Sequence, residues 1–268
     1  MTIYVVVTGD RVWDDVDTMI EPLSSYVGQD VVLIEGECQG ADLMARAIGE
    51  ELGFIVEHRP ARWRDENGSF RKWAGPERNQ LMLDEFPQIS VCHAFHNDIF
   101  SSKGTKDMLK RVISKNITRT LWATPKTSVQ GFHGKHKYLS NFTAVPVTLD
   151  GETYTSVEHA YQAAKTLDLT QRADIKKQKL AKDVKRFGKT VDKRKDWDDV
   201  KVEIMHNLLR EKFSQDLFND ALLSTRNAEL VEANYWNDTF WGVYNGKGQN
   251  VLGRLLMDVR EEVRSARH

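Results

Sequence analysis

In the first 125 residues, short apolar runs alternate with amphipathic stretches, and this alternation restricts the fold more than any other feature. The apolar runs have the length of strands and lie at residues 3–7, 31–34, 54–58 and 89–95. Helical patterns separate them, at residues 15–26, 41–52, 80–84 and 106–113. Strands separated by helices predict a parallel α/β sheet with helices on both faces. Ligands of such sheets bind at the carboxyl ends of the strands.

The pattern changes after residue 125, which predicts a second domain. Residues 123–128 have the composition of a linker. Asp150-Gly151 separates two short strand patterns, at 145–149 and 152–154, and predicts a hairpin. Helical patterns fill most of the rest, at 157–166, 171–182, 196–213, 215–223 and 252–265. We therefore predict an α/β domain over residues 1–122 and a mainly helical α+β domain over residues 129–268, in agreement with the length of 268 residues.

The composition excludes several classes of protein. With 40% hydrophobic and 29% charged residues, the chain is not disordered, collagen-like or a coiled coil. No apolar run is long enough to cross a membrane, and no secretory signal follows Met1. Neither the two cysteines, Cys38 and Cys92, nor the eight histidines form a metal motif. We therefore expect a cytoplasmic protein (in the host cytoplasm if the chain is viral) without a metal or other cofactor. The oligomeric state stays open.

The formal net charge of −1 conceals a contrast between the two halves. Residues 1–125 have a net charge of −5, and residues 126–268 have a net charge of +4. Residues 172–195, with 11 Lys and Arg against three Asp, account for most of the positive charge. Two interpretations remain open: a solvated surface, or a funnel for the phosphates of a nucleotide or a nucleic acid.

Three glycine-bearing turns follow strands in the first half, at residues 9–11, 35–42 and 101–107. Backbone N–H groups at a helix N-terminus attract anions, and glycine lets a phosphate approach the chain. Because the three turns share one sheet edge, they favour a nucleotide or phosphosugar site. The candidate contacts are Gly9, Arg11, Gly36, Gly40, Ala41, Asp42, Arg78, Gly104 and Thr105, while for Lys103 we favour ordinary surface charge.

The order of these motifs resembles the SLOG superfamily, which is related to the DNA-processing SMF proteins and to the LOG phosphoribohydrolases. The motifs are Thr8-Gly9-x-Arg11, Gly36-x-x-x-Gly40-Ala41-Asp42, Arg78-Asn79 and Gly104-Thr105. The resemblance covers residues 1–120 and implies a Rossmann-like fold that binds a nucleotide-derived ligand. The LOG enzymes have a glutamate three residues after the threonine, where this chain has Met108. The first domain is therefore interpreted as a binding domain or as an enzyme whose chemistry stays open.

Three clusters in the second half combine carboxylates, aromatic rings and glycine. In the first, Glu158, Gln162 and Lys165 share one face of a helix that Ser156 caps. The second is Asn141-Phe142. The third is Asp238 with Trp241, next to a turn that can hold phosphate; its members are Gly242, Lys247, Gly248 and Asn250. The residues of the first cluster could also form a surface network, but carboxylates beside a stacking ring favour a site that cleaves a glycosidic bond.

The order and spacing of these clusters, over residues 131–263, resemble the NADAR (YbiA-like) superfamily. Its members are N-glycosidases of ribosylated nitrogen, acting on phosphoribosylamino-pyrimidines of riboflavin synthesis or on ADP-ribosyl-guanine. The resemblance implies that Glu158 and Asp238 are catalytic and that Trp241 forms a stacking wall. It also implies that Trp197 and Lys201 line the pocket, that Lys247 contacts phosphate, and that Asn141 and Phe142 line the entry.

The leading hypothesis is therefore an N-glycosidase that hydrolyses a ribosyl–nitrogen bond of an ADP-ribosyl or phosphoribosyl compound. The first domain would bind a related nucleotide. The main alternative is a non-catalytic sensor or sponge for a signal derived from NAD or ADP-ribose. A third hypothesis is a DNA-associated protein that uses the basic segment, and ADP-ribosylated nucleic acid is a further candidate partner.

Overall fold

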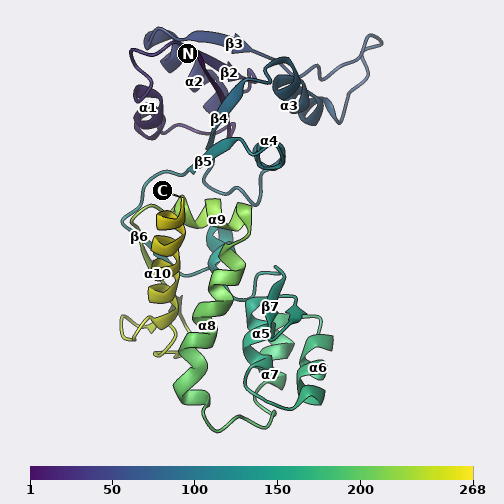
Figure 1. Cartoon of the computed structure of the whole chain (residues 1–268), viewed down its shortest axis with the longest axis vertical. Coiled ribbons are helices and arrows are strands. Elements are labelled where there is room, and N and C mark those ends of the chain that lie inside the picture. The colour runs from purple at the N-terminus through teal and green to yellow at the C-terminus, as the bar shows by residue number, and fades with distance from the viewer. Residues whose placement is uncertain (268) are drawn as a thin grey trace. The chain divides into compact units, whose positions relative to one another are not determined.

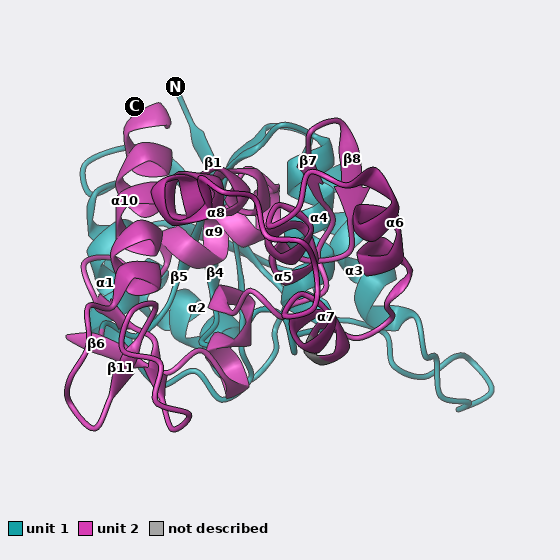
Figure 2. Cartoon of the chain, turned by 90° about the horizontal axis from the view of Figure 1, so that it is seen from below, with its two compact units in different colours: residues 1–125 teal, residues 126–268 magenta. Residues whose placement is uncertain are grey.

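The computed structural model describes residues 1–267, apart from the side chain of Lys182. The chain forms two compact units, residues 1–125 and the residues from 126 onward (Figure 2). No helix in the described part of the chain has both the length and the apolar character that a membrane span needs.

Unit 1 is built on a five-stranded parallel sheet (Figure 1). Its strands are β1 (Ile3–Gly9), β2 (Val31–Glu35), β3 (Ile55–His58), β4 (Ile89–Phe95) and β5 (Thr118–Trp122), in the order β3-β2-β1-β4-β5. This order is that of a Rossmann-like fold. The predicted α/β class is confirmed. Strand β5 was not predicted, because only its last two residues, Leu121 and Trp122, are apolar.

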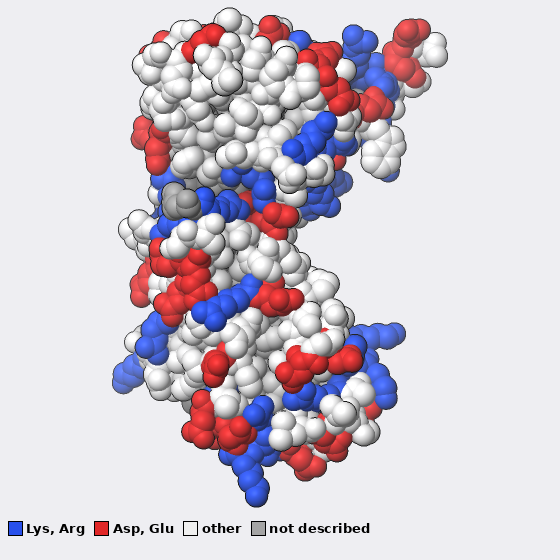
Figure 3. Space-filling model, in the orientation of Figure 1, with Lys and Arg blue, Asp and Glu red and all other residues white. Residues whose placement is uncertain are grey.

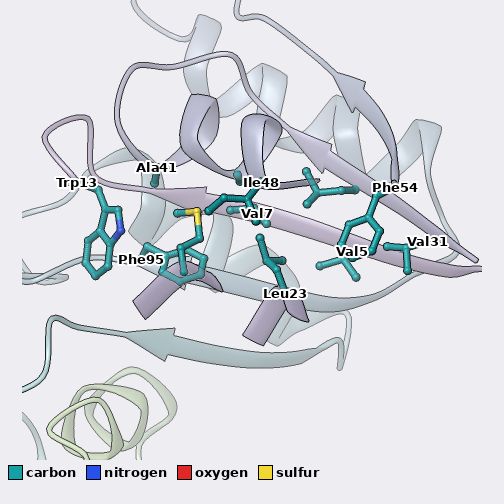
Figure 4. Close-up of a cluster of buried hydrophobic side chains, with 12 residues drawn as sticks. Val5, Val7, Trp13, Leu23, Val31, Ala41, Ile48, Phe54 and Phe95 are labelled. Carbon is teal, nitrogen blue, oxygen red and sulfur yellow. The ribbon is translucent and has the colours of Figure 1, made fainter. Parts of the chain in front are cut away.

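Helices cover both faces of this sheet. They are α1 (Val16–Ser24), α2 (Ala41–Glu51), α3 (Ala74–Glu85) and α4 (Gly104–Ser114). Val5 and Val7 of β1 pack in one cluster with Leu23 of α1 and Ile48 of α2 (Figure 4). Val6 is equally buried and points to the other face, because successive side chains of a strand alternate.

Unit 2 is mainly helical. The long helices α8 (Trp197–Phe213) and α10 (Val251–Ala266) lie side by side (Figure 1). The other elements are η1 (Gly134–Leu139), α5 (Val157–Ala163), α6 (Leu169–Lys177), α7 (Ala181–Phe187), α9 (Asp216–Leu223), β6 (Ser128–Gln130), β7 (Val147–Leu149), β8 (Glu152–Tyr154), β9 (Glu229–Val231), β10 (Ala233–Asn234) and β11 (Val243–Tyr244). The second part of the fold prediction, a mainly helical α+β domain, is also confirmed.

Two local features of unit 2 test the pattern analysis. Asp150 and Gly151 both have positive φ, 51° and 80°, and join β7 to β8 in the predicted hairpin. Residues 171–182, predicted as one helix, are instead two, because the chain is extended at Gln178 and Leu180. The carbonyl of Gln178 at this break is 3.1 Å from Nε2 of His159, which donates to it.

Candidate active site

Unit 2 contains a pocket of about 390 Å³. Its lining comes from the loop after η1, from α5, α7, α8 and α10, and from the segment after β9. The lining residues are Ser140, Asn141, Phe142, Glu158, Tyr161, Gln162, Lys165, Lys185, Trp197, Lys201, Met205, Glu232, Trp236, Asp238, Phe240, Trp241 and Leu252.

Helix α5 and the turn after it bring three of the predicted site residues to this pocket. Ser156 caps the helix and accepts a hydrogen bond from the N–H of His159. Glu158, Gln162 and Lys165 then follow at spacings of four and three residues, and all three line the pocket. The helix predicted over residues 157–166 ends earlier, at Ala163, so Glu158 and Gln162 share a face of α5 and Lys165 reaches the pocket from the turn that follows.

Glu158 is the most enclosed acidic group of the pocket, with 6% of its surface exposed. Its Oε1 accepts a hydrogen bond from Nε2 of Gln162 at 2.9 Å, and its backbone N–H donates to the carbonyl of Asn141 at 3.0 Å. Burial raises the pKa of Glu158, while the amide of Gln162 and the ammonium groups of Lys185 and Lys165 oppose the rise. A carboxylate held in this way can stabilise a positive centre inside the pocket.

Aromatic rings form one wall of the pocket. The ring of Tyr161 is 5.0 Å from Trp197 and 5.5 Å from Trp241, and it meets Trp241 edge to face at 87°. Trp241 also packs edge to face on Phe240. These rings give the pocket flat apolar surfaces on which a base or a ribose can pack.

Three lysines balance the acidic groups of the pocket. Nζ of Lys185 is 5.8 Å from the ring of Phe142 and 5.6 Å from that of Trp236. Lys201 lies 4.5 Å above the ring of Phe240 and donates to Asp198. Burial lowers the pKa of the third, Lys165. Lys185 was not predicted, because eleven basic residues share its segment and nothing in the sequence distinguishes it from the others.

Asp238, the second predicted carboxylate, lines the pocket but also holds a turn. Its Oδ1 accepts hydrogen bonds from the backbone N–H groups of Phe240, at 3.2 Å, and Trp241, at 2.9 Å. The same loop is fixed by Asn234, whose Nδ2 donates to the carbonyl of Asp238 at 2.8 Å. One carboxylate oxygen of Asp238 is therefore used to shape the loop that presents Trp241.

A third carboxyl group of the pocket, that of Glu232, was not predicted from the sequence. This residue follows β9 and lines the pocket, and its Oε2 is buried without a hydrogen-bond partner. Ser140, Tyr161, Met205, Trp236, Phe240 and Leu252 also line the pocket without having been named as site residues. The only sequence signal for Glu232 is an acidic residue directly after an apolar strand, which is too common to single it out.

Four predicted site residues lie outside the pocket lining: Gly242, Lys247, Gly248 and Asn250. Asn250 instead donates to the carbonyl of Leu230 at 2.8 Å and accepts from the N–H of Glu232 at 3.0 Å. A Cβ on Gly242 would approach the carbonyl of Glu232 to 2.3 Å, and one on Gly248 would approach the carbonyl of Gly242 to 2.2 Å. The glycine-rich turn thus packs around Glu232.

Six basic residues of segment 172–195 form ion pairs with nearby acidic groups. The pairs are Arg172–Asp150, Lys176–Glu152, Lys177–Asp174, Arg186–Asp183, Lys193–Asp198 and Arg194–Asp196. Blue and red side chains accordingly intermingle over the visible face of unit 2 (Figure 3). Of the two interpretations of this segment, these contacts favour the solvated surface, with Lys185 as the residue that reaches the pocket.

In unit 1, several candidate nucleotide contacts are occupied by the protein itself. The N–H of Ala41 donates to the carbonyl of Asp10 at 3.0 Å, and the hydroxyl of Thr105 donates to the carbonyl of Gly9 at 3.0 Å. A Cβ on Gly9 would lie 2.3 Å from that of Ala41. The close packing of helix α2 against the end of β1 therefore depends on glycine at position 9.

Gly40 and Gly104 also have local roles in unit 1. Gly40 precedes α2 with a φ of 76°, and a Cβ on it would approach the carbonyl of Asp10 to 2.3 Å. The carbonyl of Gly104, the first residue of α4, accepts a hydrogen bond from Nδ2 of Asn79 at 3.2 Å. Arg11 lies on the surface with its guanidinium 5.7 Å from the ring of Trp63.

Arg78 is the exception in unit 1, because part of its guanidinium has no hydrogen bond. Its Nη1 is buried, forms an ion pair with the carboxylate of Asp42 at 3.6 Å and has no hydrogen bond. It lies over Gly36, where a Cβ would be 1.2 Å away. Burial raises the pKa of Asp42 to about 6, although Arg78 opposes the rise. Gly36, Asp42 and Arg78 therefore form one cluster at the carboxyl end of β2.

Metal ligands do not cluster in the part of the chain that the structure describes: no group of three or more His, Cys, Asp or Glu side chains is placed to hold an ion. His159 instead accepts the hydroxyl hydrogen of Ser156 at Nδ1 and donates from Nε2 to the carbonyl of Gln178. This histidine therefore fastens α5 to the break between α6 and α7.

Residues 129–264 match the NADAR domain family. The N-glycosidase YbiA of Shigella boydii is 42% identical over 128 residues, which are 46% of this chain and 79% of that protein. A riboflavin biosynthesis protein of Vibrio vulnificus is 38% identical over 132 residues, 48% of this chain and 36% of that protein. The NMR structure of YbiA from E. coli superimposes with a TM-score of 0.50 at 35% identity, covering 55% of this chain and 90% of that chain.

Proposed function

The chain belongs to the NADAR family, and on this premise we propose that the pocket of unit 2 is an active site that hydrolyses ribosyl–nitrogen bonds. Unit 2 is a hydrolase of N-glycosyl bonds. The substrate that we propose is an ADP-ribosyl or phosphoribosyl compound, such as ADP-ribosyl-guanine or a phosphoribosylamino-pyrimidine. The position of Glu158, buried in the pocket wall between an amide and two ammonium groups, is the observation that supports this proposal most strongly.

Cleavage of a ribosyl–nitrogen bond develops positive charge on the ribose carbon, as in glycoside hydrolysis. In our proposal the Glu158 carboxylate stabilises this charge and accepts a proton from the attacking water. Gln162 holds the carboxylate by donating to Oε1, so that its orientation is fixed before substrate binds. Asp238 supports the same centre with its remaining oxygen.

The rest of the lining suggests how such a substrate would be held. Lys165, Lys185 and Lys201 line the pocket. Their ammonium groups would donate hydrogen bonds to the phosphate oxygens of the substrate. The rings of Trp197 and Trp241 would pack against the ribose or the base. Asn141 and Phe142 line the pocket, and in our proposal they border its entry.

For unit 1 we propose a binding role toward a nucleotide-derived ligand, in line with the SLOG-like motifs. The support is the cluster of Gly36, Asp42 and Arg78 at the carboxyl edge of the parallel sheet. The buried Nη1 of Arg78 lacks a hydrogen-bond acceptor, and a phosphate or ribose oxygen is an acceptor of the required kind.

The test is mass spectrometry of the products formed from a panel of ribosylated compounds. The panel contains an ADP-ribosylated guanine nucleotide and a phosphoribosylamino-pyrimidine. We expect the full chain to release the free base or amine from at least one of them. The Glu158→Gln variant should lose this activity, and Glu203→Gln, at an exposed position of α8, should keep it.

Intact recovery of every compound at high enzyme concentration would contradict the proposal. Tight binding of a compound that is recovered unchanged would favour a sensor or sponge instead.

A further inference from the structure

We propose that Glu232 is a further catalytic residue of this pocket and donates the proton that the leaving nitrogen needs. The inference rests on the proposed N-glycosidase function and assigns the one step that Glu158 and Asp238 leave without a donor. Departure of guanine or an amine is easier once its nitrogen is protonated, so a positioned general acid lowers the barrier to bond cleavage.

The hydrogen bonds of the three carboxyl groups distinguish Glu232 from the others. Oε1 of Glu158 is held by Gln162, and Oδ1 of Asp238 accepts two backbone N–H groups. Oε2 of Glu232 is buried and has no partner at all. A buried polar atom without a partner calls for an explanation, and a bound substrate would supply one.

The backbone of Glu232 is fixed from several sides. Its N–H donates to Oδ1 of Asn250 at 3.0 Å, and its carbonyl accepts from the N–H of Val243 at 2.9 Å. Gly242 packs so closely that a Cβ there would lie 2.3 Å from this carbonyl and 3.0 Å from Cγ of Glu232. Such support positions a reacting group without help from the ligand.

The surroundings of Glu232 raise its pKa, so that the carboxyl group is partly protonated near neutral pH. Burial and the neighbouring charge of Asp238 raise the pKa of Glu232 to about 7, and Lys185 opposes the rise. A general acid works best when its pKa lies near the working pH. The other ionisable side chains of the lining are Glu158, Tyr161, Lys165 and Lys201.

Three proton transfers accompany the cleavage in our proposal. The bond between the ribose carbon and the leaving nitrogen breaks, its electron pair stays on nitrogen, and the carboxyl proton of Glu232 is transferred to that nitrogen. Water adds to the ribose carbon and gives its proton to the carboxylate of Glu158. Return of one proton from Glu158 to Glu232, through solvent, restores both groups.

The experiment compares pH profiles of kcat/KM for the full chain and two variants, Glu232→Gln and Glu229→Gln, on the compound of the panel that is turned over. Glu229 is the matched control, because it lies three residues away on β9 and is exposed. We expect the wild-type rate to fall on the alkaline side with a midpoint near 7. In Glu232→Gln, kcat should drop by about 10²–10⁴-fold, KM should change little, and the alkaline limb should disappear.

Two results would overturn the role of Glu232 while leaving the proposed function intact. One is a wild-type profile that stays flat from pH 6 to 9, which needs no variant and so does not depend on folding of Glu232→Gln. The other is a Glu232→Gln variant that retains the alkaline limb. Complete absence of turnover by the wild-type chain would instead overturn the proposed function, and this inference with it.

Discussion

The backbone of Gly188 lies directly against the side-chain amide of Gln162. A Cβ atom at position 188 would come within 2.0 Å of Oε1 of that amide, although Gly188 has an ordinary helical φ of −63° that alanine also adopts. The residue after α7 therefore determines where the amide lies, and this amide donates to Glu158.

Gly188→Ala should consequently reduce activity by displacing Gln162, with little direct cost to the backbone. We expect kcat to fall by about 10-fold or more, because the Glu158 carboxylate loses its fixed orientation. Steady-state kinetics of Gly188→Ala, Gln162→Ala and the double variant provide the check. The double variant should be no slower than Gln162→Ala alone, since both changes remove the same hydrogen bond; additive losses would disprove the connection.

Two adjacent aromatic residues permit a matched test of stacking. Trp236 lines the pocket, whereas its neighbour Tyr235, 5.0 Å away ring to ring, does not and is 88% exposed. Stacking on a base contributes about 1–3 kcal/mol, so Trp236→Ala should raise KM by roughly 10-fold or more. Tyr235→Ala should leave KM within about 2-fold of wild type. Equal effects of the two substitutions would argue against a stacking role at position 236.

Unit 1 offers a test of the proposed second ligand site. In Gly36→Ala the new Cβ would lie 1.2 Å from Nη1 of Arg78, so the guanidinium must leave its buried position. With ADP-ribose as probe, calorimetry on a chain that also contains Glu158→Gln should find one binding site fewer in Gly36→Ala. Arg78→Met should behave in the same way, and Arg62→Met, at an exposed position, should retain both sites. An unchanged number of sites in Gly36→Ala would rule out this location.

His93 makes the stability of unit 1 depend on pH. Its Nδ1 accepts from the indole N–H of Trp122 at 3.1 Å, so the neutral ring donates from Nε2 to the hydroxyl of Tyr26, and burial lowers the pKa of His93 to about 4. The unfolded chain takes up a proton near pH 6.5 and the folded chain only near pH 4. Stability should therefore be lost as the pH falls from 6.5 to 4, by an amount on the order of 3 kcal/mol.

Native-state hydrogen exchange of the β4 amides measures this loss within unit 1. His93→Gln should flatten the pH dependence between 6.5 and 4, and His58→Gln, at an exposed position, should not. A pH dependence that survives in His93→Gln would assign the acid sensitivity to other groups.

The sequence revealed those features that depend on short-range periodicity. Strand β4 has the predicted bounds, and the spacing of Glu158 and Gln162 was enough to put them on one face of α5. Strands β6 and β9 were not predicted because three residues are too few to show alternation and no hairpin turn joins them, whereas Asp150-Gly151 marks the equally short β7 and β8. Their pairing joins segments that are far apart in the chain.

Glu232 escaped for a related reason. Its significance comes from Asp238, Lys185 and the packing of Gly242, and these contacts depend on how the loop after β9 folds back and on α7, which is far away in the chain. The glycine-rich turn was predicted to hold phosphate, and periodicity and composition could not show that it packs around Glu232 from outside the pocket lining.

The ion pairs of segment 172–195 have a consequence for how quickly substrates arrive. Because the opposite charges of each pair lie side by side, the paired side chains contribute little field beyond the Debye length of about 8 Å in physiological salt. Long-range attraction of a phosphate-bearing substrate by unit 2 would therefore come from its net charge of +4 and not from all eleven basic residues of the segment. Its association rate should consequently depend on ionic strength less than the basic segment alone suggests, and selection for negative charge at contact would take place among the lysines of the pocket.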